Sequence, residues 1–339
     1  MLDGVAMSGL LSTVLAQPTA VETLRRALTG GRVHHAYLFD GPDGVGKELA
    51  AFGLAQGLVC ERRKPAEAEA CGACSACSRA VPRAGETRPL HPDVVVLERG
   101  LYDPASIGRK SPETQDLSID QVRTLVLARA AFAPHEGRAK VFIVRRADEL
   151  STSAANALLK TLEEPGARTH FVLLTSMPDL LLPTIRSRTL RVRFGPLPDE
   201  VVTKLLIARG TALDLAAQIA GLAGGSMAGA NALADPEASA QREQFVSRAM
   251  AAIESDDAGA ALDLAVDAKK LEKDALAVQL QALAVALGGQ AREAAGAADS
   301  RADVAAARHG LAHAAIQQLE GNASSQLAVE AMLLKMRAV

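Results

Sequence analysis

A short stretch near the start of the chain has the residue types and spacing of a phosphate-binding loop. Its key residues are Gly41, Gly44, Gly46 and Lys47. Glycines let backbone N–H groups curl around phosphate oxygens, while the lysine and the N-terminus of the following helix supply positive charge. The next position should carry a hydroxyl that binds Mg²⁺, but it is Glu48. The loop therefore lacks this metal ligand. A carboxylate about 4 Å from a phosphate would also cost about 4 kcal/mol at an effective dielectric constant of about 20.

The cysteines of the chain lie together in one polar segment, with the spacing of a metal site. They are Cys60, Cys71, Cys74 and Cys77, the last three in a C-x2-C-x2-C pattern. Closely spaced thiolates bind Zn²⁺ tetrahedrally, and four of them fill the coordination shell. The pattern therefore predicts a structural zinc site with no open position for catalysis. Inert or redox-active thiols are the alternative.

Four apolar runs predict the buried strands that must position these residues. They cover residues 36–39, 92–97, 140–144 and 171–174. Helical patterns lie at residues 9–30, after the phosphate loop, at about 119–132 and at 152–164. Strands that alternate with helices imply βαβ units and a parallel sheet. The polar residues 60–92, which hold the cysteines, have the composition of an insertion.

The sequence changes character after Phe194, where helical patterns without strands begin. These patterns are short up to about residue 234 and become long, Ala-rich and Leu-rich from about residue 238. We predict three domains from this change. They are an α/β domain at 1–195 with a zinc-module insertion at about 60–80, a small helical domain at 196–235 and a helical C-terminal domain at 236–339.

The composition is that of a soluble globular protein. Of 339 residues, 49% are hydrophobic and 22% charged, and 37 basic residues nearly balance 39 acidic ones. A chain without basic excess does not grip nucleic acid strongly by itself. No apolar run reaches the roughly 18–20 residues of a membrane helix, and the N-terminus lacks the features of a secretory signal. We therefore expect a cytosolic protein with reduced thiols and no membrane contact.

Several motifs together resemble one known family. Residues 35–39 lead into the phosphate loop, the four-cysteine module follows it, and residues 153–165 read SAANALLKTLEEP. With residues 182–188, LPTIRSR, the chain resembles bacterial clamp-loader subunits of the AAA+ class, most specifically the delta-prime family of DNA polymerase III subunits. Gln17 fits the glutamine of the family's N-terminal motif, although Ala16 replaces its usual glycine.

The resemblance implies an architecture and partners. Residues 1–195 would form an AAA+ α/β domain, 196–235 a helical lid, and 236–339 an all-α collar whose last helix includes residues 327–334. The partners would be the motor subunits and the delta subunit of a hetero-pentamer, and through that complex the sliding clamp and primer-template DNA. Structural Zn²⁺ would be the resident cofactor.

The resemblance also shows how far this chain departs from an ATPase. Such an enzyme needs acidic residues after the third strand to hold Mg²⁺ and polarise water, and this chain has Arg145 and Arg146 there. Asp148 lies further along, where we expect it not to reach the same place. The arginine of the second domain is missing as well, since residues 225–230 read GSMAGA. We expect no ATP hydrolysis, and whether nucleotide binds at all is left open.

Arg188 belongs to a family motif whose arginine this chain retains. Ser187-Arg188-Thr189 takes the place of the family's Ser-Arg-Cys motif, whose arginine enters the ATP site of the adjacent subunit. The resemblance thus implies a non-hydrolysing arm that supplies a trans arginine finger. A surface arginine in an ion pair is the alternative, since Arg186 and Arg191 lie nearby.

Two other functions remain as alternatives. One is an active ATPase motor with an unusual metal site that uses Asp148. The other is a zinc-dependent DNA-binding factor whose function resides in residues 60–83, where Arg62, Arg63, Lys64 and Arg79 surround the cysteines. A solvated basic loop is the simpler interpretation of these four side chains.

Overall fold

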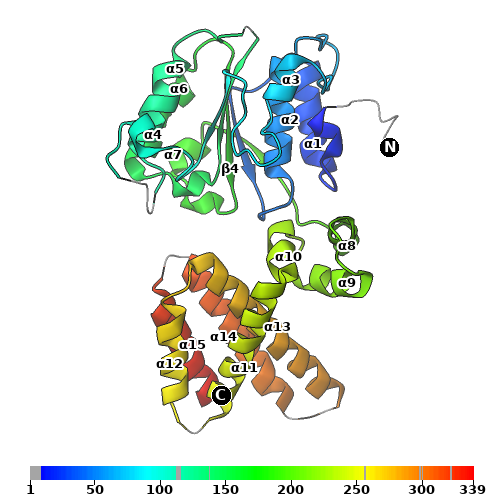
Figure 1. The fold of residues 1–339 in the computed structure, drawn as a ribbon, viewed down its shortest axis with the longest axis vertical. Helices are drawn as coiled ribbons and strands as arrows, with labels where there is room; N and C mark the ends of the chain where they lie inside the picture. Colours follow the sequence, from blue (N-terminus) through cyan, green and yellow to red (C-terminus); the bar gives the residue numbers. More distant parts are fainter. Residues whose placement is uncertain are drawn as a thin grey trace. The chain divides into compact units, whose positions relative to one another are not determined.

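The chain divides into two compact units. The computed structural model describes residues 9–111, 116–136, 138–255, 257–297, 299, 301–320 and 323–339 (Figure 1). The first unit comprises Met1–Val201 with Gly225–Met227, and the second comprises Val202–Gly224 with Ala228–Val339. The finer division into three domains stays a prediction.

A five-stranded parallel sheet forms the centre of the first unit. The strands are β1 (Ala36–Asp40), β2 (Val94–Leu97), β3 (Lys140–Val144), β4 (Thr169–Thr175) and β5 (Leu190–Arg193). Their order in the sheet is β2-β3-β4-β1-β5, with every pair parallel. The runs of Val, Leu, Ile and Phe in β1 to β4 are almost wholly buried, as expected for a parallel sheet covered on both faces. The predicted fold class, an α/β sheet with flanking helices followed by helices, is confirmed.

Helices cover the two faces of this sheet. One group, at the right in Figure 1, is α1 (Pro18–Thr29), α2 (Lys47–Val59) and α3 (Ser75–Arg79). The other is α4 (Ile119–Gln121), α5 (Ala128–Ala130), α6 (Thr152–Glu163) and α7 (Pro183–Arg186). Phe142 and Phe171 stack in the core at 5.1 Å between ring centroids, and Leu158 of α6 packs in the same cluster.

Two predicted helices are broken into shorter pieces. Residues 9–30 form a 3₁₀ turn, Leu10–Thr13, and then α1, because Pro18 disfavours helix at the residue before it and starts a new helix well. Ala16 between them has φ 54°. Residues 119–130 begin and end as α-helix, but Val122–Leu127 form a π-helix. The single helix predicted at 9–30 is therefore wrong, whereas the helix predicted at about 119–132 is present over 119–130 with a π-helical middle.

The fifth strand was not predicted from the sequence. β5 reads LRVR, and only Val192 is buried. One apolar residue between two arginines gives no apolar run and too short an alternation to predict a strand. Its place at the edge of the sheet, paired with β1 alone, explains this polar composition.

The second unit is helical, as predicted. It contains all but the first residues of α8 (Asp199–Ala208) and α10 (Met227–Ala234). Its other helices are α9 (Leu213–Leu222), α11 (Pro236–Glu254), α12 (Gly259–Ala268), α13 (Lys273–Gly296), α14 (Arg301–Glu320) and α15 (Ser325–Ala338). Alanine, the strongest helix former, alternates along them with leucines such as Leu276, Leu280 and Leu287, which are buried in one core. Among the described helices, none is long and apolar enough to cross a membrane.

Candidate functional site

The phosphate loop lies where the sequence predicted it, between β1 and α2. Gly44 and Gly46 have φ of 78° and 101°, values that residues with a side chain rarely adopt. A Cβ on Gly41 would lie 2.1 Å from the carbonyl oxygen of Phe194. The glycines are thus required by the path of the loop itself, whether or not a phosphate binds.

Lys47 turns its ammonium group back onto this loop. Its Nζ donates to the carbonyl oxygens of Gly41 and Pro42, the latter at 2.7 Å, and lies 3.1 Å from Oδ1 of Asp43. The side chain is only 8% exposed. The ammonium group of Lys47, which neutralises phosphate in a working loop, is therefore bound here to the loop itself.

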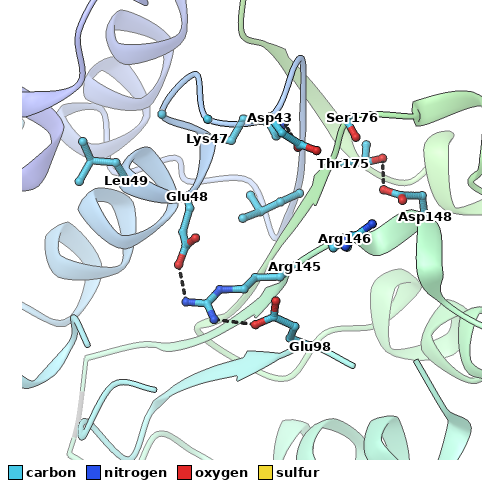
Figure 2. Close-up of a pocket in the computed structure, with 13 residues that line it drawn as sticks. Asp43, Lys47, Glu48, Leu49, Glu98, Arg145, Arg146, Asp148, Thr175 and Ser176 are labelled. Carbon is cyan, nitrogen blue, oxygen red and sulfur yellow. Dashed lines mark hydrogen bonds and ion pairs between the residues drawn. The ribbon is translucent and has the colours of Figure 1, made fainter. Parts of the chain in front are cut away.

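Arg145 lies between two carboxylates at the carboxyl end of the sheet (Figure 2). Its guanidinium donates to Glu48 in the first turn of α2 and, at 2.7 Å, to Oε2 of Glu98 directly after β2. It also lies over the ring of Phe52, 6.0 Å from the centroid. Burial opposes its charge, but the two carboxylates outweigh burial and raise the pKa of Arg145 above its usual value. The carboxylate of Glu48 is thus compensated from within the chain.

Asp148 does line the same cavity, so the expectation that it would not reach this place is wrong. After β3 the chain turns sharply at Arg146, whose φ is 47°, and continues as a 3₁₀ turn, Ala147–Glu149. This turn brings the Asp148 carboxylate next to the end of β4, where it accepts a hydrogen bond from Oγ1 of Thr175 (Figure 2). Arg146 itself pairs with Glu149, with 2.8 Å between Nε and Oε1.

The cavity bounded by these residues has a volume of about 310 Å³, at the lower end of the range for small-molecule sites. Its charged lining residues are Asp43, Lys47, Glu48, Glu98, Arg145, Arg146 and Asp148. Four carboxylates thus face three cations, and two of these cations are bound to members of the set. This balance does not attract a polyphosphate.

The cysteines converge, as the sequence predicted. The Sγ atoms of Cys60 and Cys71 are 3.7 Å apart, those of Cys60 and Cys74 3.9 Å, and those of Cys71 and Cys77 4.0 Å. All four sulfur atoms lie within 4.8 Å of one another. Zn–S bonds of about 2.3 Å in a tetrahedron place sulfur atoms about 3.8 Å apart, so the set has the dimensions of a tetrahedral metal site.

Backbone donors and burial give these sulfurs unequal acidity. The N–H groups of Cys71, Cys74 and Cys77 point at the preceding sulfur of the set, at 3.3–3.5 Å. Burial disfavours the Cys74 thiolate, but the backbone N–H groups of Cys77 and Glu61 and the thiols of Cys77 and Cys71 outweigh burial and lower the pKa of Cys74 to about 7. Burial raises the pKa of Cys77. Thiolate-stabilising donors around a sulfur cluster suit a metal that binds deprotonated cysteine.

The cysteine module is fastened to the helices beneath it. Gln56 of α2 donates to the carbonyl oxygen of Cys77 at 3.0 Å and accepts from the N–H of Leu10 at 3.1 Å. Arg63 donates to the carbonyl oxygen of Gly57 at 2.6 Å, and Arg79 forms two hydrogen bonds with Glu136, at 2.6 and 2.8 Å. Two of the four basic side chains are therefore engaged within the chain, which does not favour residues 60–83 as a DNA-binding surface.

Arg188 lies at the surface just after α7. Its Nε donates to Glu163, the last residue of α6, at 2.7 Å, and a second nitrogen contacts the same carboxylate oxygen. Its third nitrogen donates to the carbonyl oxygen of Thr184 at 2.9 Å. The side chain is still 35% exposed. The guanidinium is thus held in one orientation at the surface.

Gln17 has a structural place in this site. The side chain is buried, with Nε2 donating to the carbonyl oxygen of Gly195 at 2.7 Å and Oε1 accepting from its N–H at 3.0 Å. It therefore ties the segment before α1 to the segment that follows β5.

Sequence reasoning missed Glu98 and Glu163 as partners of the two key arginines. A signal for Glu98 was present, because it directly follows β2 as Arg145 directly follows the adjacent β3. Carboxyl ends of neighbouring parallel strands meet at one edge of the sheet. Glu163 gave no comparable signal, since the contact depends on how α6 and α7 pack.

Fold and site together define a phosphate-loop α/β protein with an internally paired site and a separate cysteine cluster. A family model described as "DNA polymerase III, delta subunit" matches residues 16–198, more than half of the chain. The chain therefore belongs to this family, and the resemblance to bacterial clamp-loader subunits is confirmed.

Related proteins are subunits of the same polymerase. DNA polymerase III subunit gamma/tau of Mycobacterium tuberculosis is 39% identical over 193 residues, which is 57% of this chain and 30% of that protein. Subunit delta′ of Pseudomonas aeruginosa is 38% identical over 64% of this chain and 61% of its own length. Subunit delta′ of Bacillus subtilis is 32% identical over 61% of this chain and 56% of its own length. The chain thus spans less than two thirds of each of these relatives.

Proposed function

We propose that this chain is a delta-prime-like subunit of the DNA polymerase III clamp loader that does not itself hydrolyse ATP. The ion pairs of Arg145 with Glu48 and Glu98 carry this proposal. Hydrolysis needs oxygen ligands for Mg²⁺ and a carboxylate that polarises water, and a guanidinium supplies neither. Lys47, bound to the carbonyl oxygens of its own loop, supports the same conclusion.

The chemical contribution of the chain would be Arg188, inserted into the ATP site of a neighbouring motor subunit. A guanidinium is permanently charged, and its planar fork matches the oxygens of a phosphoryl group. Arg188 is exposed enough to meet a neighbour, and its contacts with Glu163 and Thr184 hold it in place beforehand. The chain would thus complete a catalytic site that it does not contain.

The remaining assignments follow from the same proposal. The cysteine cluster would hold Zn²⁺ as a structural ion, because all four coordination positions are filled by sulfur. The motor subunits and the delta subunit would complete a hetero-pentamer that acts on the sliding clamp and primer-template DNA. This assembly would work in the bacterial cytosol, at the replisome.

Arg188→Ala in the reconstituted assembly tests this function. An arginine finger is worth about 10³–10⁵ in rate, so single-turnover ATP hydrolysis at the one neighbouring site should fall by up to this factor. Total DNA-stimulated turnover should fall by that site's share, while assembly remains intact by size-exclusion chromatography.

Arg186→Ala is the matched control, because Arg186 lies two positions away and pairs with Asp179 at 2.7 Å. It should leave hydrolysis unchanged. Normal hydrolysis in the Arg188→Ala assembly would remove the finger assignment.

An ATPase motor that uses Asp148 is the second candidate, because the Asp148 carboxylate lines the cavity together with Lys47. It requires ATP turnover by the isolated chain that is lost in Lys47→Ala. Turnover that survives this substitution comes from a contaminating enzyme, and absence of turnover eliminates the candidate.

A further inference from the structure

We propose that Arg145 is a built-in cation which takes the place of a divalent metal, so that the phosphate-loop site is held together without metal or nucleotide. The fold family implies Mg²⁺ at this place, and the residues present do not fit it. The inference concerns the binding specificity of this site and does not depend on the role of Arg188.

The guanidinium of Arg145 lies where three elements of the first unit meet. Glu48 directly follows Lys47 in the first turn of α2, Glu98 directly follows β2, and Arg145 directly follows β3. Three separate elements thus meet at one point, and Arg145 joins all three (Figure 2). In a metal-dependent phosphate loop, the ion itself lies at this edge and joins the helix to the strand ends.

The burial of Arg145 and the charges of its two partners also disfavour a metal ion at this place. The Arg145 side chain is 14% exposed, and its neighbours Glu48 and Glu98 are 46% and 32% exposed. Mg²⁺ requires oxygen ligands at about 2.0–2.1 Å in near-octahedral geometry. Here both carboxylates are occupied by a guanidinium, which would also repel the ion. A side chain therefore occupies both carboxylates in place of a metal ion.

The phosphate-binding lysine of the loop is likewise bound to groups of the chain itself. Lys47 is 8% exposed and bound to two loop carbonyl oxygens, so a phosphate would have to displace these contacts. Arg145 cannot compensate by binding the phosphate, because its two outer nitrogens are committed to Glu48 and Glu98. We infer that wild-type stability is indifferent to Mg²⁺ and to Mg²⁺–ATP.

Arg145→Gln is the decisive variant. It removes the cation but leaves the carboxylates of Glu48 and Glu98 facing the vacated place, together with Asp148 across the cavity. We expect a lower midpoint of thermal unfolding without divalent ions and a partial recovery when Mg²⁺ or Ca²⁺ is added. Differential scanning fluorimetry of the zinc-loaded full chain, with metal titrated as its chloride against ionic-strength-matched NaCl, measures both.

Arg25→Gln is the matched control, because Arg25 forms an ion pair with Glu69 elsewhere in the first unit. It should lower the midpoint without recovery by divalent ions. If Arg145→Gln also shows no recovery, or if wild type gains stability from Mg²⁺–ATP, the proposal is overturned.

A second variant replaces Glu48 and Arg145 together with the residue types that a metal-dependent phosphate loop carries. Glu48→Thr with Arg145→Asp places a hydroxyl and a carboxylate where a metal-dependent loop has them. Isothermal titration should show ATP binding that requires Mg²⁺ in this variant and none in wild type. Mg²⁺-dependent ATP binding by wild type contradicts the proposal.

Failure of Arg188→Ala to slow a neighbour's ATPase overturns only the proposed function, so the two failures are distinguishable.

Discussion

Glu163 controls how Arg188 is presented. The carboxylate accepts from two nitrogens of the guanidinium and fixes its direction, but it also competes with any phosphate for the same donors. Glu163 is the last residue of α6, where the negative end of the helix dipole lies. A nearby cation therefore stabilises its carboxylate against this unfavourable field. In the proposed function the residue would therefore be both a positioning partner and a competitor.

Glu163→Gln should relieve the competition while keeping the shape of the side chain. An ion pair of this exposure is worth at most about 1 kcal/mol, so we expect at most about a fivefold gain in the ATPase rate of the assembly at subsaturating ATP. Steady-state kinetics should show the gain as a higher kcat with little change in KM, because an arginine finger acts in the transition state.

The double variant Glu163→Gln with Arg188→Ala is the control for this prediction. If Glu163 acts through Arg188, its substitution has no effect once the arginine is gone. A gain that persists in the double variant would show that Glu163 acts elsewhere.

At the scale of elements, strands with continuous apolar runs were predictable and marginal ones were not. β3 was predicted with its observed bounds, because Lys140–Val144 is buried on both faces. β5 was missed, because an edge strand is exposed enough to carry two arginines among its four residues. The break before α1 was visible in Pro18, whereas nothing in residues 122–127 predicts a π-helix.

The candidate site follows the same division. Spacing along the chain was enough for the phosphate loop and the cysteines, since each set belongs to one contiguous segment. The partners of Arg145 come from α2 and β2, and no local pattern encodes that meeting. Asp148 was misjudged because strand direction alone does not show that the chain folds back after Arg146.

The cysteine module supports α2, so metal removal should affect more than the module. Gln56, near the C-terminal end of α2, connects Cys77 to Leu10. We expect Cys74→Ser, or dialysis against a strong chelator, to remove one bound zinc per chain and to lower the midpoint of thermal unfolding markedly, because structural zinc contributes directly to folding.

Zinc content by plasma mass spectrometry and unfolding by circular dichroism measure these two effects. Ser78→Ala is the control, since Ser78 lies in the same module but is exposed and carries no ligand atom. Wild-type protein that contains no zinc after expression in zinc-supplemented medium would contradict the metal assignment.

At the scale of the whole molecule, neutral histidines in both units set the response to acid. Burial is the main cause that lowers the pKa of His35, His91 and His170 in the first unit and of His309 in the second. A histidine with a lower pKa in the folded state than in the unfolded state binds fewer protons when folded. The free energy of unfolding contributed by these histidines is therefore fully present above about pH 6.5, and it is lost as the pH falls from there through their lowered pKa values.

Urea unfolding between about pH 7.5 and 5 should show this loss directly. In His170→Asn the free energy of unfolding should fall less steeply with decreasing pH, while His35, His91 and His309 preserve part of the slope. An unchanged slope in this variant would mean that His170 does not titrate differently in the folded state.

The exchange of charge between positions 48 and 145 has a consequence for descent. Starting from this chain, a lone change of Arg145 to an acid leaves three carboxylates crowded together, and a lone change of Glu48 leaves the guanidinium with one partner fewer. Either step alone is therefore expected to lower the free energy of unfolding before a metal site is restored. Positions 48 and 145 are therefore coupled, and the pair is expected to change together or not at all.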